Sequence, residues 1–275
     1  MTTSASRRGG PGALAVLGRL TDRDRLICRI LWEHRVLTTE QVCDLCFSNL
    51  VTAQHRLVTL WRLGVIDRFR PLRPTGSESW RYTLGPAGAA IVAAERGVDP
   101  PRASALQATV VALAAGQRTG HTLGVNGFFC SLHKTARLHP DMAVVAWWSE
   151  RRCAAEWGDL VRPDAFGIWE QGGQRVEFFL EHDTGSESLS RVAAKLDGYR
   201  DLAEADGFAR PVLFWLSKPG REAGLRRALD KAQVPVATGV PGAAEPAEAV
   251  WLPVGQETPR WRLIDLAESA KAPRR

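Results

Sequence analysis

The chain has 275 residues, of which 45% are hydrophobic and 24% charged, with 25 Gly and 16 Pro. This balance is typical of a globular protein and excludes collagen-like, coiled-coil and wholly disordered classes. The length suits two small domains or one large one. The apolar runs are far too short for a bilayer span, and the N-terminus lacks the apolar stretch of a secretory signal. We therefore expect a cytoplasmic protein without membrane contact, and its five Cys residues give no reason to expect disulfides.

The net charge of +6 is concentrated in the first third of the chain. Residues 1–100 hold 14 Arg, no Lys and 9 acidic residues, whereas residues 101–275 are almost neutral. A local positive excess is typical of a segment that binds an anionic partner such as nucleic acid. Because Arg and Ala are abundant throughout, genome composition is an alternative source of part of this excess.

The first hundred residues predict three helices followed by a hairpin. One helix begins after Thr21, with acidic residues in its first turn, and Thr38 or Thr39 caps a second. A third helix runs from about residue 51 to residue 63 and ends at Gly64. Two extended runs, at residues 65–70 and 79–84, follow it. This is the element order of a winged helix.

The third predicted helix has two distinct faces. Its apolar stripe comprises Ala53, Leu57, Leu60 and Trp61. The opposite face carries Thr52, His55, Arg56, Thr59 and Arg62. In a winged helix this face enters the major groove of DNA and the hairpin contacts the backbone or minor groove. The hairpin arginines are Arg68, Arg70, Arg73 and Arg81. We expect binding to double-stranded DNA; the alternative is a winged helix with a solvated basic face that contacts protein.

Two cysteines in the second predicted helix have a spacing that also occurs in zinc sites. Cys43 and Cys46 are separated by two residues, but no second Cys/His pair lies at a usable distance. Their helix has an apolar pattern, which favours packing in a core. We expect no zinc.

The second half of the chain predicts a mixed sheet with helices, in the order α-β-β-β-α-β-α-β. We expect a disordered leader over residues 1–18, a winged-helix domain over 19–100, a linker helix over 101–118 and an α/β domain over 119–270. The resulting fold class is α+β or α/β. The most informative elements are a strand starting near residue 164, a strand over residues 176–183 and a helix from residue 184 to about 204.

Acidic residues at the strand ends are the candidate catalytic groups. Asp164 begins one strand, and Glu181 and Asp183 end the next on a common face. If Asp164 lies adjacent across the hairpin, three carboxylates converge and require a divalent cation such as Mg²⁺ or Mn²⁺. Such a cation polarises a phosphodiester and activates water. The alternatives are a turn cap for Asp164, solvated strand-end positions for the other two, and a helix cap for Asp183.

Three segments resemble the replication-relaxation proteins of actinobacterial plasmids and related mobile elements. They are HTLGVNGFFCSL, RPDAFGIW and FFLEHDTGSESLSRVAAKLDGY, within a resemblance over roughly residues 20–265. The resemblance implies a PD-(D/E)XK, restriction-endonuclease-like core behind the winged helix, and a role in plasmid replication and DNA relaxation. It also implies that Asp164 is the motif aspartate and Glu181 the second metal carboxylate.

The chain departs from this nuclease motif at the lysine of E-x-K, where it has Asp183. The nearest lysine, Lys195, lies on the following helix, and Arg191 one turn earlier is a substitute. If that helix starts at Thr184, Lys195 sits about 16 Å along it and reaches the acids only if the helix folds back across the strand ends. Asp164, Glu181, Asp183 and Lys195 are thus the candidate catalytic set.

Tyr199 has two interpretations. A covalent relaxase needs a nucleophilic tyrosine, and Tyr199 lies one turn from Lys195, but a half-buried packing residue is the simpler interpretation. Our hypothesis is a DNA-binding protein that nicks or relaxes DNA by metal-dependent cleavage. The alternative is a non-catalytic replication or transcription factor whose second domain is an interaction or dimerisation platform. The partners are then double-stranded DNA, replication or conjugation proteins and a second copy of the chain.

Overall fold

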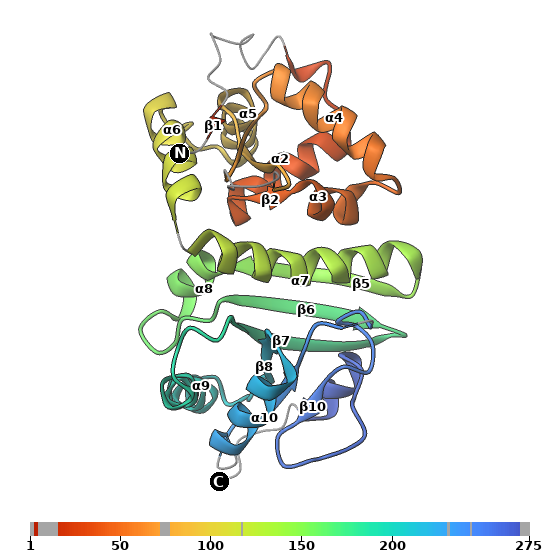
Figure 1. The fold of residues 1–275 in the computed structure, drawn as a ribbon, viewed down its shortest axis with the longest axis vertical. Helices are drawn as coiled ribbons and strands as arrows, with labels where there is room; N and C mark the ends of the chain where they lie inside the picture. Colours follow the sequence, from red (N-terminus) through yellow and green to blue (C-terminus); the bar gives the residue numbers. More distant parts are fainter. Residues whose placement is uncertain are drawn as a thin grey trace. The chain divides into compact units, whose positions relative to one another are not determined.

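The computed structural model describes residues 3–4, 16–71, 78–116, 118–229, 232–242 and 244–269. The chain forms two compact units, Met1–Cys130 and Ser131–Arg275 (Figure 1). The boundary between them falls inside helix α7 (Arg118–Leu138), later than the expected domain start at residue 119. Within the described residues no helix combines the length and apolar character needed to cross a bilayer.

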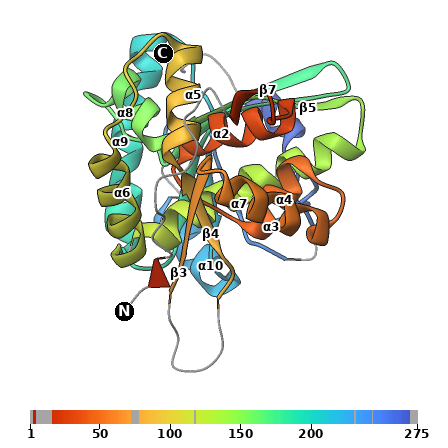
Figure 2. The ribbon, with the colours of Figure 1, turned by 90° about the horizontal axis from the view of Figure 1, so that it is seen from above.

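Unit 1 is built from helices and a small antiparallel sheet. Its helices are α2 (Asp22–His34), α3 (Thr39–Cys46), α4 (Leu50–Arg62), α5 (Pro86–Arg96), α6 (Ala103–Ala115) and the first part of α7. Its strands are β1 (Thr3–Ser4), β2 (Leu37–Thr38), β3 (Ile66–Arg70) and β4 (Arg81–Leu84), in the sheet order β1-β3-β4-β2. Strands β3 and β4 run side by side as a ribbon (Figure 2). Of the predicted leader, residues 1–2 and 5–15 lie outside the described part of the chain.

The helix ends in unit 1 follow from local capping. The Thr21 side chain accepts a hydrogen bond from the Asp24 backbone N–H, and the Asp24 carboxylate accepts one from the Thr21 backbone N–H in return. Thr38, one of the two expected caps, forms the same reciprocal pair with Gln41 at the start of α3. Gly64 follows α4 with a φ of 74°, a conformation that favours glycine.

Helix α6 packs on the sheet of unit 1 and is not merely a linker. Val110 of α6 is buried together with Val36 and Phe69, which lies on β3. Helix α6, which lies within the predicted linker, therefore contributes Val110 to a buried cluster of unit 1. The apolar positions of an Ala-rich helix are too uniform to reveal which of its sides is buried, which explains why the sequence pattern did not predict this contact.

The first part of α7 is also anchored in unit 1. Asn126 is buried, and its amide donates to the carbonyl oxygens of His34 at 3.2 Å and Val36 at 2.7 Å. The Gln41 amide donates to the carbonyl oxygen of Leu123 at 2.7 Å. Backbone oxygens at a helix end need such partners when they are buried. These contacts explain why the unit boundary lies within α7.

Unit 2 contains a mixed sheet, as predicted, and six strands form it among the described residues. Its elements are β5 (Met142–Ser149), α8 (Glu150–Trp157), β6 (Ala165–Gln171), β7 (Gln174–Asp183), α9 (Leu189–Asp206), β8 (Val212–Leu216), α10 (Pro219–Ala228), β9 (Val236–Gly239), β10 (Leu252–Pro253) and the 3-10 helix η1 (Ile264–Ser269). The strand order is β10-β9-β8-β7-β6-β5. Strands β5, β6 and β7 are antiparallel, and β7, β8 and β9 are parallel.

Helices α8, α9 and α10 share one face of this sheet. Phe166 of β6 and Phe179 of β7 form a buried core there with Leu202 of α9 and Leu225 of α10. Because strand side chains alternate between faces, residues two and four positions after Phe179 point to the same helices. The end of β7 therefore presents its acidic side chains toward α9 and α10.

Helix α9 begins five residues later than predicted. The Ser188 side chain accepts a hydrogen bond from the Arg191 backbone N–H and caps the helix, whereas Thr184 lies in the preceding loop. With Leu189 as its first residue, Lys195 lies only about 9 Å along the helix at the standard rise. The late start brings Lys195 closer to the end of β7 than the sequence pattern indicated.

Candidate functional site

Asp164 and Glu181 face each other at the end of the β6–β7 hairpin. Ala165 pairs with Leu180 in this antiparallel register, so the next pair outward is Asp164 and Glu181. The Asp164 carboxylate accepts a hydrogen bond from the backbone N–H of His182 at 2.8 Å. The structure thus brings two of the predicted acids together, and we call them the acid pair.

Two residues of α9 hold both oxygens of Glu181. The Lys195 ammonium donates to Glu181 Oε2 at 2.7 Å, and the Tyr199 hydroxyl donates to Glu181 Oε1 at 2.6 Å. Residues four positions apart share one face of a helix, so both donors approach from the same side. Glu181 is only 3% exposed. Lys195 therefore reaches the acid pair, as the sequence hypothesis requires.

The burial of Glu181 and the charges around it shift the pKa values of the groups at this site. Burial, together with the charge of Asp164, raises the pKa of Glu181 from 4.5 to about 7, although Lys195 and Tyr199 act in the opposite direction. Burial by itself lowers the pKa of Lys195, but the charges of Glu181 and Asp164 outweigh it and raise this pKa. The two carboxylates thus form an acidic cluster whose negative charge holds the Lys195 ammonium.

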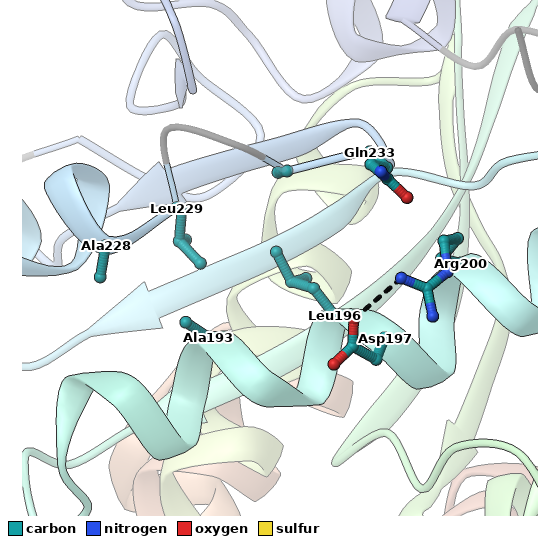
Figure 3. Close-up of a pocket in the computed structure, with 8 residues that line it drawn as sticks. Ala193, Leu196, Asp197, Arg200, Ala228, Leu229 and Gln233 are labelled. Atoms are coloured by element: carbon teal, nitrogen blue, oxygen red, sulfur yellow. Dashed lines mark hydrogen bonds and ion pairs between the residues drawn. The ribbon is translucent and has the colours of Figure 1, made fainter.

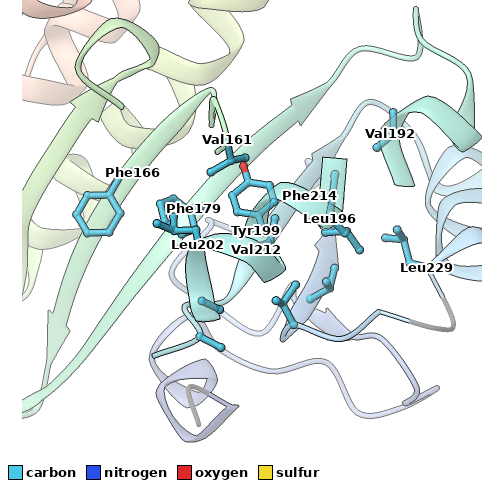
Figure 4. Packing of buried hydrophobic residues seen from close by; sticks show 14 of the residues in the cluster. Val161, Phe166, Phe179, Val192, Leu196, Tyr199, Leu202, Val212, Phe214 and Leu229 are labelled. Carbon is cyan, nitrogen blue, oxygen red and sulfur yellow. The ribbon is translucent and has the colours of Figure 1, made fainter. Parts of the chain in front are cut away.

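Tyr199 is a buried hydrogen-bond donor. It is 2% exposed and packs against Phe179 with ring centroids 5.1 Å apart (Figure 4). Burial raises its pKa well above the usual 10, and the charge of Glu181 raises it further. A phenolate nucleophile is disfavoured under these conditions, so the geometry supports a role in holding Glu181 and not the relaxase interpretation.

Asp183 does not join the acid pair. Its carboxylate accepts hydrogen bonds from Arg221 of α10, at 2.8 Å from Nε and 3.2 Å from Nη2, and from the backbone N–H of Gly185 at 2.7 Å. Arg221 also donates to the carbonyl oxygen of Glu187 at 2.6 Å. The expected convergence of three carboxylates is therefore absent, because a guanidinium neutralises the third. Arg221 lies far along the chain from Asp183, and no local pattern in the sequence indicates their pairing.

The donor set fits a hard divalent cation bound by two protein carboxylates. Among the described residues, no group of three or more His, Cys, Asp and Glu side chains could hold a metal ion. However, Mg²⁺ is commonly bound through one or two carboxylates, with waters and substrate phosphates completing its octahedron. Asp164 and Glu181 supply such oxygens, so the residues present fit a cation that substrate helps to bind.

A separate cavity of about 190 Å³ lies between α9 and α10 (Figure 3). Its lining residues are Ala193, Leu196, Asp197, Arg200, Ala228, Leu229, Ala232 and Gln233. The Arg200 guanidinium donates to the Asp197 carboxylate at 3.0 Å, so its charged groups neutralise each other. The cavity includes no candidate catalytic residue, and we assign no function to it.

In unit 1, the half-buried Arg56 is committed to contacts within the protein. Its Nε donates to Asp24 Oδ1 at 2.9 Å, a second ion pair joins Nη2 to Asp24 Oδ2, and Nη2 also donates to the Arg19 carbonyl oxygen at 3.1 Å. Asp24 is fully buried. The sequence interpretation of Arg56 as a DNA contact overlooked this pairing, because Asp24 also had a complete explanation as a capping residue.

The other predicted polar residues of α4 remain at its surface. Thr52, His55 and Arg62 are exposed, and Thr59 is half-buried with its hydroxyl donating to the His55 carbonyl oxygen at 3.1 Å. Their spacing of three and four residues places them on one face of the helix. This face, which we call the α4 face, is the part of the predicted DNA-reading surface that is available to a partner.

The arginines of β3 stack on tryptophans. The Arg68 guanidinium lies 3.9 Å from the Trp61 ring centroid and 4.2 Å from that of Trp80. The Arg70 guanidinium lies 4.7 Å from Trp80. Such cation–π contacts hold guanidinium groups without neutralising their charge.

The other two predicted hairpin arginines differ from this pair. Arg81 forms an ion pair at 2.6 Å with Glu78, three positions before it. The predicted Arg73 lies outside the described residues.

The fold and site define a mixed α/β protein of two units, with an Asp–Glu–Lys cluster at the end of a mixed sheet. The family model for replication-relaxation proteins matches residues 29–213. Because this span is more than half of the chain, the protein belongs to the replication-relaxation family. No curated protein and no solved structure matches it. The matched span includes Asp164, Glu181 and Lys195 but ends before Arg221.

Proposed function

We propose that the protein acts in plasmid or mobile-element replication or transfer, where unit 1 binds duplex DNA and unit 2 cuts one DNA strand. Membership of the replication-relaxation family supports the biological setting. The observation that carries the cutting activity is the cluster in which Lys195 contacts Glu181 beside Asp164.

Unit 1 is proposed to be a winged helix. Its order of α2, α3 and α4 followed by the β3–β4 ribbon matches that architecture, with α4 as the helix that enters the major groove. The α4 face offers Arg62 for phosphate or guanine and smaller polar groups for other contacts. The stacked Arg68 and Arg70 keep their charge at the ribbon and suit the phosphate backbone.

Unit 2 is proposed to be a nuclease-like core that hydrolyses a phosphodiester. Its element order is α7, β5, α8, β6, β7, α9 and β8, which is the α-β-β-β-α-β succession that the sequence pattern predicts with α8 added after β5. Asp164 and Glu181 would hold Mg²⁺ or Mn²⁺, which supplies polarisation of the phosphate and activation of water. Lys195 stabilises the charge that develops on the scissile phosphate as the P–O ester bond breaks and the water oxygen bonds to phosphorus.

The second candidate is a DNA-binding factor whose unit 2 is an interaction or dimerisation platform. It is favoured by Asp183, which stands in the place of the E-x-K lysine and is committed to Arg221. In this candidate, Lys195 and Tyr199 serve only to neutralise and bury Glu181. The partners would be replication or conjugation proteins or a second copy of the chain.

A supercoiled-plasmid assay with Mg²⁺ or Mn²⁺ separates the two candidates. The nuclease proposal expects open-circle product from the wild type, loss of product in Asp164→Ala and Lys195→Ala, and retention in Arg200→Ala. Arg200 is a matched control because it lies on the same helix with the same 36% side-chain exposure as Lys195. A protein that shifts DNA in a gel but gives no product would support the platform.

A further inference from the structure

Lys195 occupies the position in which a cation would neutralise the acid pair. Its ammonium lies 2.7 Å from Glu181 Oε2, and the charge of Asp164 also acts on it. The other Glu181 oxygen is held by the buried Tyr199 hydroxyl. Of the two Glu181 oxygens, Oε2 is therefore the one held by a half-exposed, flexible side chain, that of Lys195.

A divalent cation and the Lys195 ammonium compete for this oxygen. Two positive charges within a few ångströms repel each other strongly in a partly buried site. Tyr199 is fixed by its packing in the core, whereas Lys195 has a long flexible side chain that is 36% exposed. Of the two donors to Glu181, Lys195 is consequently the one that can move away from its carboxylate oxygen.

Glu187 offers Lys195 a second position. The Lys195 ammonium is already 3.8 Å from Glu187 Oε2, and Glu187 is 39% exposed at the edge of the site. The carbonyl oxygen of Glu187 is held by Arg221, which fixes the loop that carries it. Both carboxylates thus have an oxygen within 3.8 Å of one ammonium.

We propose that Lys195 is an internal counter-ion with two positions. In the cation-free protein it neutralises the acid pair through Glu181, and when a divalent cation binds it moves to Glu187. This inference rests on the proposed function of the acid pair as a cation site. It explains how the buried Glu181 and the half-buried Asp164 stay side by side before a cation arrives. It also makes Lys195 a group that competes with the cation for Glu181 Oε2 as well as a phosphate-stabilising group.

Calorimetric titration of the EDTA-treated full chain with MnCl₂, without DNA, tests the proposal. Lys195→Met is expected to bind Mn²⁺ about tenfold more tightly than the wild type, the scale on which neighbouring groups change metal affinity. Glu187→Gln is expected to bind Mn²⁺ more weakly, because Lys195 loses its second position. Arg200→Met removes one positive charge from the same helix and is expected to leave the affinity unchanged.

The outcomes distinguish this proposal from the nuclease activity. Unchanged or weaker Mn²⁺ binding by Lys195→Met overturns the counter-ion role, even if the wild type nicks DNA. Tighter binding by Lys195→Met supports the role, even if the plasmid assay gives no product. Failure of both wild type and Lys195→Met to bind Mn²⁺ overturns the counter-ion role together with the metal site. Melting curves in EDTA check folding, and Lys195→Gln replaces Lys195→Met if the latter unfolds.

Discussion

Replacement of Arg56 by Ala distinguishes a structural arginine from a DNA-reading one. The substitution removes two hydrogen bonds to Asp24 and one to the Arg19 carbonyl oxygen. Loss of one partner of a buried ion pair costs about 3–5 kcal/mol. Because the Arg56 side chain is 28% exposed and Asp24 keeps its hydrogen bonds to Thr21, we expect a smaller loss, about 2–3 kcal/mol.

The free energy of unfolding is measured by urea titration followed by far-UV circular dichroism. Hydrogen exchange then shows whether the loss is confined to α2 and α4. The matched control is Arg62→Ala on the same helix, because Arg62 is exposed and its removal should change stability by less than about 0.5 kcal/mol. Gel shifts at several salt concentrations should show the reverse order, with Arg62→Ala weakening DNA binding and lowering the salt slope by about one.

A double-mutant cycle completes this test. In an Asp24→Asn background, removal of Arg56 leaves no buried charge uncompensated. Arg56→Ala should therefore lower the free energy of unfolding by less in this background than in the wild type. The reasoning is refuted if Arg56→Ala leaves stability within about 0.5 kcal/mol of the wild type while weakening DNA binding as much as Arg62→Ala does. Arg56 would then be a DNA contact, as its position on α4 first indicated.

Three further predictions concern buried polar groups. The pKa of Glu181 is raised from 4.5 to about 7, so between these pH values the folded protein retains a proton that the unfolded chain releases. In EDTA, the free energy of unfolding should therefore fall as the pH rises from 4.5 to 7. Urea titrations of Glu181→Gln should lack the slope that this group produces. Tyr199→Phe keeps the packed ring but removes the donor to Glu181 Oε1, so nicking should fall about 10–100-fold with unchanged DNA binding in gel shifts. Asn126→Ala leaves the carbonyl oxygens of His34 and Val36 without its amide and should lower stability by about 2–3 kcal/mol in urea titration, whereas equal stability would show that water replaces the amide.

The helices and strands were predictable from the sequence where their signals are local. Thr21, Thr38 and Gly64 mark helix ends through contacts with residues a few positions away. The mixed sheet was predictable because β5 and β8 are almost entirely apolar and β7 has an apolar centre. The start of α9 was not, because Thr184 and Glu187 have capping-box spacing but tertiary contacts hold this loop in another conformation.

Part of the candidate site was predictable for a related reason. Asp164 and Glu181 meet through a hairpin register, which short-range pairing determines. The partner of Asp183 comes from α10, on the far side of a parallel crossover, and no spacing in the sequence indicates it. The contact of Lys195 with Glu181 depends on the late start of α9, so only the structure could show it.

The pairing of Asp183 with Arg221 has a consequence for variation among relatives. The family match ends at residue 213, inside β8, yet Asp183 within it depends on a guanidinium from beyond that limit. A family member with a lysine at the position of Asp183 would place two cations together if it kept Arg221. Positions 183 and 221 should therefore covary across the family, and an acid at the first should predict an arginine or lysine at the second.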